Sequence, residues 1–178
     1  MGRSSKTTEF LMDCMGDALL RLMRDQSFEK ISIGQIVKTA GVGRSTWFRH
    51  FDTKTDALTY RVARMWYQWA EDHGIDGARR YNPDNAAQFF QFNYEIRPVL
   101  IMIYSAGLPT VIYTAFNQVM VHQFGDQIDE RYWRCFFSYG LFGLLEEWIK
   151  RDFAESPEEM TAIFLRMMAC SEIKDEWK

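Results

Sequence analysis

Apolar residues recur along most of the chain at the three- and four-residue intervals typical of amphipathic helices. In the first such segment, Leu11 to Leu22, six apolar residues fall on one helical face. No segment shows the two-residue alternation of a half-buried strand. The pattern therefore predicts an all-α chain. Further helices are expected at residues 32–40, 44–51, 54–74, 84–94, 98–106, 109–124, 129–153 and from 157 onward.

Residues that favour helix ends support several of these boundaries. Ser32 with Gln35, and Ser156 with Glu159, have the spacing of a capping box, and Thr53 is also expected to cap a helix. Residues 41–43 read Gly-Val-Gly and interrupt the helical pattern. Residues 74–83 are rich in turn formers, and we interpret them as a link between two parts of the chain.

Residues 32–51 have the outline of a helix-turn-helix, in which a tight glycine-containing turn joins two short helices. Trp47 and Phe51 lie four residues apart and are expected to face the core. The outward residues are then polar or basic, and none is acidic: Arg44, Ser45, Thr46, Arg49 and His50. Such side chains bind phosphates and base edges. The pattern by itself leaves a plain helical hairpin open as an alternative.

The distribution of charge also favours a nucleic-acid partner at the N-terminal part of the chain. Residues 1–64 carry 11 Lys/Arg and 7 Asp/Glu, whereas residues 65–178 carry 10 and 17, within a chain of net charge -3. A basic N-terminal part on an acidic chain suggests a polyanionic partner at that end.

Residues 28–51, FEKISIGQIVKTAGVGRSTWFRHF, and their continuation DTKTDAL resemble the signature of the tetracycline-repressor (TetR) family of transcriptional regulators. The resemblance covers about residues 10–62. Residues 136–149 and 156–160 resemble the C-terminal part of one branch of that family. Together with the helical pattern, the resemblance implies a three-helix helix-turn-helix DNA-binding domain at 1–53. A helical effector-binding and dimerisation domain is expected at 54–178.

By the layout of that family, Arg44, Ser45 and Thr46 face base edges. The chain has Gly43 and Phe48 where the family often has serine and a phosphate-binding tyrosine, so we expect the phosphate contacts at Arg49, His50 and Lys54. Ser32 lies at a helix N-terminus that is expected to meet the DNA backbone, so we include it among the phosphate contacts. The predicted DNA-binding residues are thus Ser32, Arg44, Ser45, Thr46, Phe48, Arg49, His50 and Lys54.

Signatures of other chemistry are absent from the sequence. The three histidines lie far apart, with no metal-ligand spacing, and there is no phosphate-binding loop or nucleophile motif. We therefore expect no enzyme, no metal and no cofactor.

The three cysteines, Cys14, Cys135 and Cys170, suggest no disulfide framework, which favours a cytoplasmic location. The longest apolar run, residues 99–104, is too short to span a membrane.

The segment 129–153 is apolar on nearly all sides, which predicts burial against its own chain on one face and a second copy on another. Glycines would allow a partner helix to come close. The predicted homodimer interface comprises Gly140, Leu141, Gly143, Leu144, Trp148, Phe164 and Met167. A deeply buried helix in a monomer is the alternative.

The middle of the chain carries more aromatic and methionine side chains than its core requires, and such side chains suit adaptable binding surfaces. We expect a pocket for a small apolar or aromatic effector, lined by Trp66, Phe89, Phe92, Met102, Tyr104, Tyr113, Phe116 and Phe137. The alternative is that these rings simply fill the core.

The sequence thus predicts a repressor of palindromic or near-palindromic operator DNA. A helical hydrophobic-ligand-binding or structural protein without DNA binding is the second hypothesis.

Overall fold

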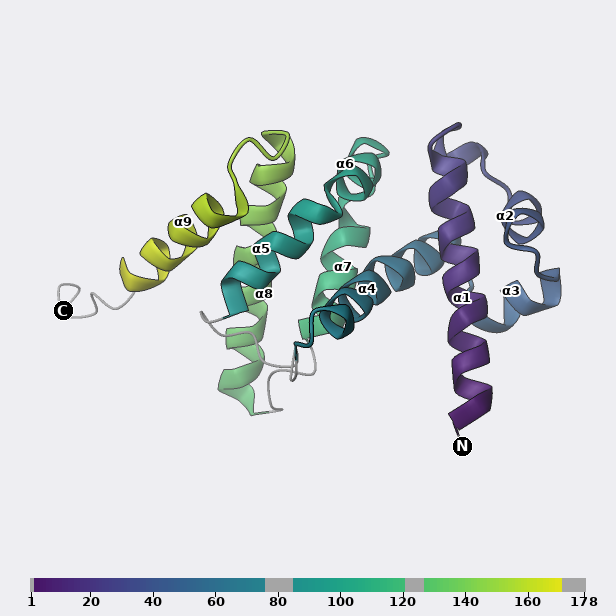
Figure 1. Ribbon diagram of the computed structural model, residues 1–178, viewed down its shortest axis with the longest axis horizontal. Helices are drawn as coiled ribbons and strands as arrows, with labels where there is room; N and C mark the ends of the chain where they lie inside the picture. The colour runs from purple at the N-terminus through teal and green to yellow at the C-terminus, as the bar shows by residue number, and fades with distance from the viewer. Residues whose placement is uncertain (1, 76–84, 121–126, 171–178) are drawn as a thin grey trace. The chain divides into compact units, whose positions relative to one another are not determined.

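The computed structural model describes residues 2–75, 85–120 and 127–170 (Figure 1). The described residues form helices and no strands, as the sequence predicts. The helices are α1 (Gly2–Met23), η1 (Phe28–Lys30), α2 (Ile33–Ala40), α3 (Arg44–His50), α4 (Lys54–Asp72), α5 (Ala86–Glu95), α6 (Arg97–Ser105), α7 (Pro109–Met120), α8 (Ile128–Lys150) and α9 (Pro157–Cys170).

The chain divides into two compact units. Unit 1 comprises Met1–Asp76 with Met102–Val119, and unit 2 comprises Gly77–Ile101 with Met120–Lys178. α4 packs against α1 and belongs to the same unit as the helix-turn-helix, and the functional boundary expected at residue 53 stays a prediction. Most of the predicted link, residues 76–83, and the predicted end of the seventh helix, residues 121–124, lie outside the described residues.

Capping residues set the helix starts in unit 1. The Ser32 amide donates to Gln35 Oε1 over 2.8 Å, and the Gln35 amide donates to Ser32 Oγ over 3.2 Å. Thr53 and Asp56 exchange the equivalent bonds at the start of α4, over 2.8 and 3.1 Å. Each box satisfies amides that have no partner inside the helix. The predicted starts of α2 and α4 are confirmed.

α1 packs against both α2 and α4, so it is the helix around which unit 1 is assembled (Figure 1). The contact with α4 is close at Gly16, where a Cβ atom would come within 2.5 Å of the Arg61 Cβ. Apolar side chains from four helices of this unit are almost completely buried, namely Met15, Leu19, Ile36, Trp47 and Leu58.

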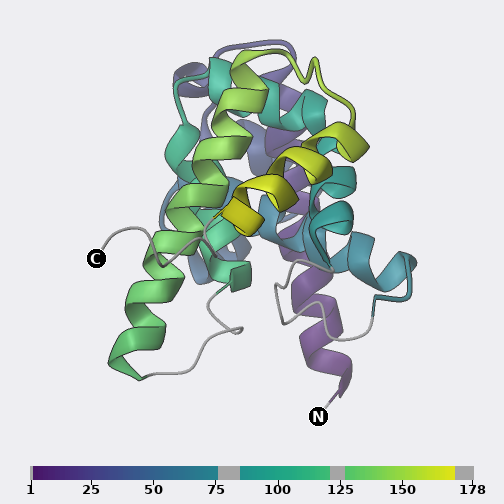
Figure 2. The ribbon, with the colours of Figure 1, turned by 90° about the vertical axis from the view of Figure 1, so that its left-hand side faces the viewer.

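Unit 2 is built around Trp148 of α8, which is 1% exposed. Its ring lies 5.8 Å from that of Phe90, 6.0 Å from that of Tyr94 and 4.6 Å from that of Phe153. The indole Nε1 donates to the Glu155 carbonyl over 3.1 Å. α9 lies against α5, and Figure 2 shows this pair beside α8. Trp148 thus links α5, α8 and the turn into α9.

α8 ends at Lys150, earlier than the predicted Phe153, because the next turn leaves the helical conformation. Asp152 and Phe153 both have φ of 55°, a left-handed conformation that is costly for residues other than glycine. The turn places the Phe153 ring, 5% exposed, against Trp148. Burial of that ring offsets the backbone cost. The predicted capping box of Ser156 and Glu159 then starts α9, with bonds of 2.8 and 3.2 Å.

Candidate DNA interface

α2 and α3 form the predicted helix-turn-helix, and the turn between them is fixed by backbone bonds. Gly41 has φ of 68°, the left-handed conformation in which helices commonly end on glycine. Its amide donates to the Lys38 carbonyl, and the Val42 amide donates to the Val37 carbonyl over 3.0 Å. This C-cap ends α2 and allows α3 to start three residues after Gly41, at Arg44.

Two aromatic residues anchor α3 to unit 1. Trp47 is 0% exposed and Phe51 is 4% exposed, and their rings lie 5.4 Å apart. The Phe51 ring also contacts Tyr60 of α4 at 5.7 Å. Because the anchors occupy one side of so short a helix, the orientation of its other side is fixed. The prediction that Trp47 and Phe51 face the core is confirmed.

The opposite side of α3 faces solvent. Arg44, Ser45, Phe48 and Arg49 are exposed, while Thr46 and His50 are half-buried. The Arg44 guanidinium lies beside the first turn of α2, since a Cβ on Gly34 would come within 3.1 Å of its Nη2. The helix therefore presents two arginines and polar side chains to solvent, a composition suited to phosphates and base edges.

The two predicted DNA contacts outside α3 have partners within the protein. The Ser32 hydroxyl accepts from the Gln35 amide and donates to Gln35 Oε1 over 2.9 Å, so the capping box uses it. Lys54 is only partly exposed, and its ammonium donates to the carbonyls of Phe28 and Ile31 over 2.6 and 2.7 Å.

Lys54 has two further contacts, both with the segment that precedes α2. Its ammonium donates to the Glu29 carbonyl over 3.4 Å and lies 4.4 Å from the centre of the Phe28 ring. The ammonium thus binds carbonyls within η1 and directly after it, and Lys54 joins the start of α4 to the entry of α2. The phosphate contact expected of Lys54 stays a prediction. The sequence did not indicate these internal bonds, because any residue can supply the carbonyl acceptors.

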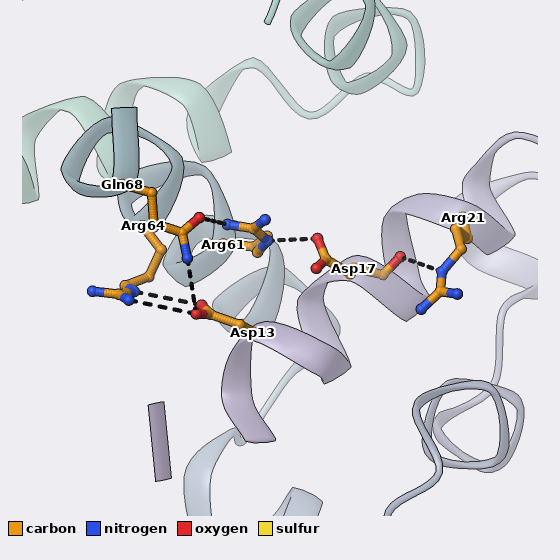
Figure 3. Close-up of polar contacts among 6 residues, drawn as sticks. All are labelled: Asp13, Asp17, Arg21, Arg61, Arg64 and Gln68. Atoms are coloured by element: carbon orange, nitrogen blue, oxygen red, sulfur yellow. Dashed lines mark hydrogen bonds and ion pairs between the residues drawn. The ribbon is translucent and has the colours of Figure 1, made fainter. Parts of the chain in front are cut away.

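A row of polar contacts, which we call the α1–α4 seam, joins Asp13 and Asp17 of α1 to Arg61, Arg64 and Gln68 of α4 (Figure 3). Arg61 Nε lies 2.6 Å from Asp17 Oδ1, and Arg64 Nε lies 3.5 Å from Asp13 Oδ1. Gln68 donates to Asp13 over 3.1 Å and accepts from Arg61 Nη1 over 2.9 Å. Gln68 thereby connects the two ion pairs into one network.

The pKa values of two groups at the α1–α4 contact, Arg64 and Tyr60, are raised. Burial disfavours the charged guanidinium of Arg64, but the hydrogen bond and charge of Asp13 outweigh it, so the pKa of Arg64 is raised. Burial, together with the negative charge of Asp13, raises the pKa of the Tyr60 phenol to about 12. The raised pKa of Arg64 keeps its guanidinium charged for the ion pair with Asp13.

The residues predicted to line an effector pocket are divided between the units. Unit 1 contains Trp66, Met102, Tyr104, Tyr113 and Phe116, all half-buried. Trp66 and Trp69 stack at 5.8 Å along α4. Unit 2 contains Phe137, half-buried and 6.3 Å from the Phe164 ring, together with Phe89 and Phe92, each 5% exposed. The pocket itself stays a prediction.

The residues predicted for a dimer interface also separate into groups. Leu141, Trp148 and Phe164 are at most 3% exposed, so these three form part of the core and offer almost no surface to a second chain. Gly140, Gly143 and Met167 are exposed, and Leu144 is half-buried. The sequence pattern marked α8 as apolar nearly all round but did not show which side its own chain covers.

The first half of α8 carries exposed aromatic residues that the predicted interface omitted. Tyr132 and Phe136 are each 72% exposed, and Trp133 is 54% exposed. These three residues line an open hollow of about 340 Å³. Together with Tyr139, 58% exposed, they form a surface that we call the α8 aromatic face. The sequence signal that could have identified this surface is the crowding of aromatic residues within eight positions.

The described part of the chain holds no group of three or more His, Cys, Asp or Glu side chains placed to bind a metal ion. None of its helices is long and apolar enough to cross a membrane. The geometry that stands out is therefore the anchored α3 with its exposed basic and polar side.

Comparison with protein families agrees with this geometry. Residues 17–58 match the model described as bacterial regulatory proteins, tetR family. Residues 88–170 match the model described as transcriptional regulator C-terminal region, of the same family. None of the curated proteins compared with the chain matches it. The N-terminal match contains α2 and α3, and the C-terminal match contains α8 and nearly all of α5. The chain belongs to the TetR family of transcriptional regulators.

Proposed function

We propose that this DNA-binding transcriptional regulator is a homodimeric repressor that reads a palindromic or near-palindromic operator with α3. The observation that carries the proposal is the exposure of Arg44, Ser45 and Arg49 on a helix whose opposite side is fixed by the buried Trp47. An α-helix fits the major groove of B-DNA, where arginine binds guanine in a bidentate manner. Family membership supports a role as a transcription factor, and the absence of an enzymatic activity is part of the proposal.

The roles of the side chains follow from their places on α3. Arg44 begins the helix beside α2, and in helix-turn-helix proteins the N-terminal residues of the second helix contact base edges. We assign Arg44, Ser45 and Thr46 to base edges, and Arg49 and His50 to phosphates. Ser32 and Lys54 then act mainly by holding α2 and α4 in place, because their polar groups bind within the protein.

A second copy of the chain is proposed to cover the exposed apolar surface of α8 and α9. This surface includes the α8 aromatic face, together with Gly140, Gly143, Leu165 and Met167. Large exposed apolar patches mark interaction sites, and most soluble oligomers are symmetric homodimers. The glycines favour close approach, since a Cβ at either would meet no atom within 4 Å in the chain itself. A two-fold dimer presents two α3 helices, which suits a palindromic site.

The effector is proposed to be small and apolar or aromatic. Half-buried rings and Met102 in unit 1 support it, because such side chains adapt to ligands and are incompletely covered by the chain. α4 carries Trp66 and Trp69 and also the α1–α4 seam. A ligand that displaces α4 would therefore move the helix that supports the helix-turn-helix. A cytoplasmic location is part of this proposal.

Phe136→Glu is predicted to convert the dimer to a monomer, because it places a charge in the α8 aromatic face without removing a buried side chain. Light scattering at micromolar concentration measures the mass. The wild type should give about twice the chain mass of 21.1 kDa, and the variant about that mass. Phe10→Glu is the matched control, since Phe10 is 65% exposed on α1 and should leave the dimer intact. A monomeric wild type would contradict the proposal.

A thermal-shift screen of aromatic and lipophilic compounds is predicted to yield ligands that raise the Tm and also change operator affinity. The shift follows from binding to the folded state only. Each hit is then measured by gel shift with operator DNA. Ligands that raise the Tm and leave operator affinity unchanged would show that binding and DNA recognition are not coupled.

Arg44→Ala is predicted to cost about 1–3 kcal/mol in operator binding and to relax the preference at one base pair in each half-site. Arg44→Lys is the matched control: it keeps the charge but loses bidentate geometry, so it should relax the same base pair with little change in salt dependence. Operators selected from genomic fragments serve as the probe. An equal loss on operator and random DNA would show that Arg44 contacts phosphate and not a base.

A further inference from the structure

Phe48 is placed on the solvent side of α3 with no role in the core. It is 63% exposed, whereas the neighbouring Trp47 is completely buried. Trp47 and Phe51 already fill the contact between α3 and the rest of unit 1. A phenyl ring exposed to this extent loses the stabilisation that burial would give it. A partner that covers the ring would restore that stabilisation.

The position of Phe48 restricts that partner. It follows Arg44 by four residues and Ser45 by three, so it lies one turn along the same side of the helix. Arg49 follows it directly, and both arginines are exposed. An apolar ring among cations on a DNA-binding helix will be covered by nucleic acid when the helix docks.

The chemistry of the phenyl ring limits which group of the DNA it can contact. A phenyl group has no hydroxyl or amine, so it makes no conventional hydrogen bond with a phosphate or with the polar atoms of a base edge. The major groove exposes one apolar group among the four bases, the C5-methyl of thymine, and aromatic side chains can contact it. An exposed ring one turn after Arg44 and Ser45 matches this group and no other base edge.

We propose that Phe48 packs against the C5-methyl of a thymine in each operator half-site and thereby determines specificity at that base pair. This inference rests on the proposed function, because it requires α3 to lie in the major groove. Arg44 and Phe48 would then read neighbouring bases along one turn of the helix, one by hydrogen bonds and the other by apolar contact.

The test replaces each thymine of a selected operator in turn by deoxyuridine, which lacks only the methyl group. Fluorescence anisotropy measures the Kd for the wild type, Phe48→Ala and Phe10→Ala. The wild type should bind about fourfold more weakly when one particular thymine of a single half-site is replaced, equivalent to about 0.8 kcal/mol for one buried methylene-sized group. Phe48→Ala should be insensitive at that position. Phe10→Ala, which removes an equally exposed ring from α1, should respond as the wild type does.

Three results would overturn the assignment. They are a wild type insensitive at every thymine, a Phe48→Ala variant equally sensitive at the same thymine, and an operator whose half-sites lack thymine. Failure of the wild type to bind any genomic fragment would instead contradict the proposed function, and the assignment with it. Because Phe48 is exposed, its removal should leave the fold intact, and circular dichroism checks this.

Discussion

The close contact between α1 and α4 is the constraint on which the rest of unit 1 depends. Gly16 lets the stem of Arg61 lie directly on α1, and any larger residue would force the two backbones apart. This approach brings Arg61 within reach of Asp17 and Arg64 within reach of Asp13. α4 then supports Phe51 of the helix-turn-helix through Tyr60, and Lys54 holds the entry of α2. The exposed side of α3 is thus oriented by helices that do not themselves have to touch DNA.

Features set by neighbouring residues could be predicted from the sequence. The capping boxes at Ser32 and Ser156 depend on residues three positions apart, so their spacing was sufficient. The spacing of Trp47 and Phe51 predicted the buried side of α3, and the family resemblance was needed to favour a helix-turn-helix over a plain helical hairpin. The family match then agrees with the signature quoted from residues 28–58.

Features that depend on distant partners could not be predicted in the same way. Lys54 bonds to carbonyls more than twenty residues earlier, and backbone acceptors leave no trace in the sequence. In α8, hydrophobicity alone did not separate the buried Trp148 from the exposed Phe136. The decisive difference is that Trp148 meets rings from α5 and from the turn after α8. The sequence places Gly16 in the first helix, but it does not show that Arg61 packs on this glycine.

The central claim is that the contact of α1 with α4 orients α3 for DNA binding, and Gly16→Ala tests it most directly. The added methyl would clash with Arg61 Cβ at 2.5 Å, so overpacking of about 1–3 kcal/mol should lower the Tm by several degrees. The variant, still folded at 25 °C by circular dichroism, should also bind the operator several-fold more weakly than the wild type. A lowered Tm with unchanged operator affinity would contradict it.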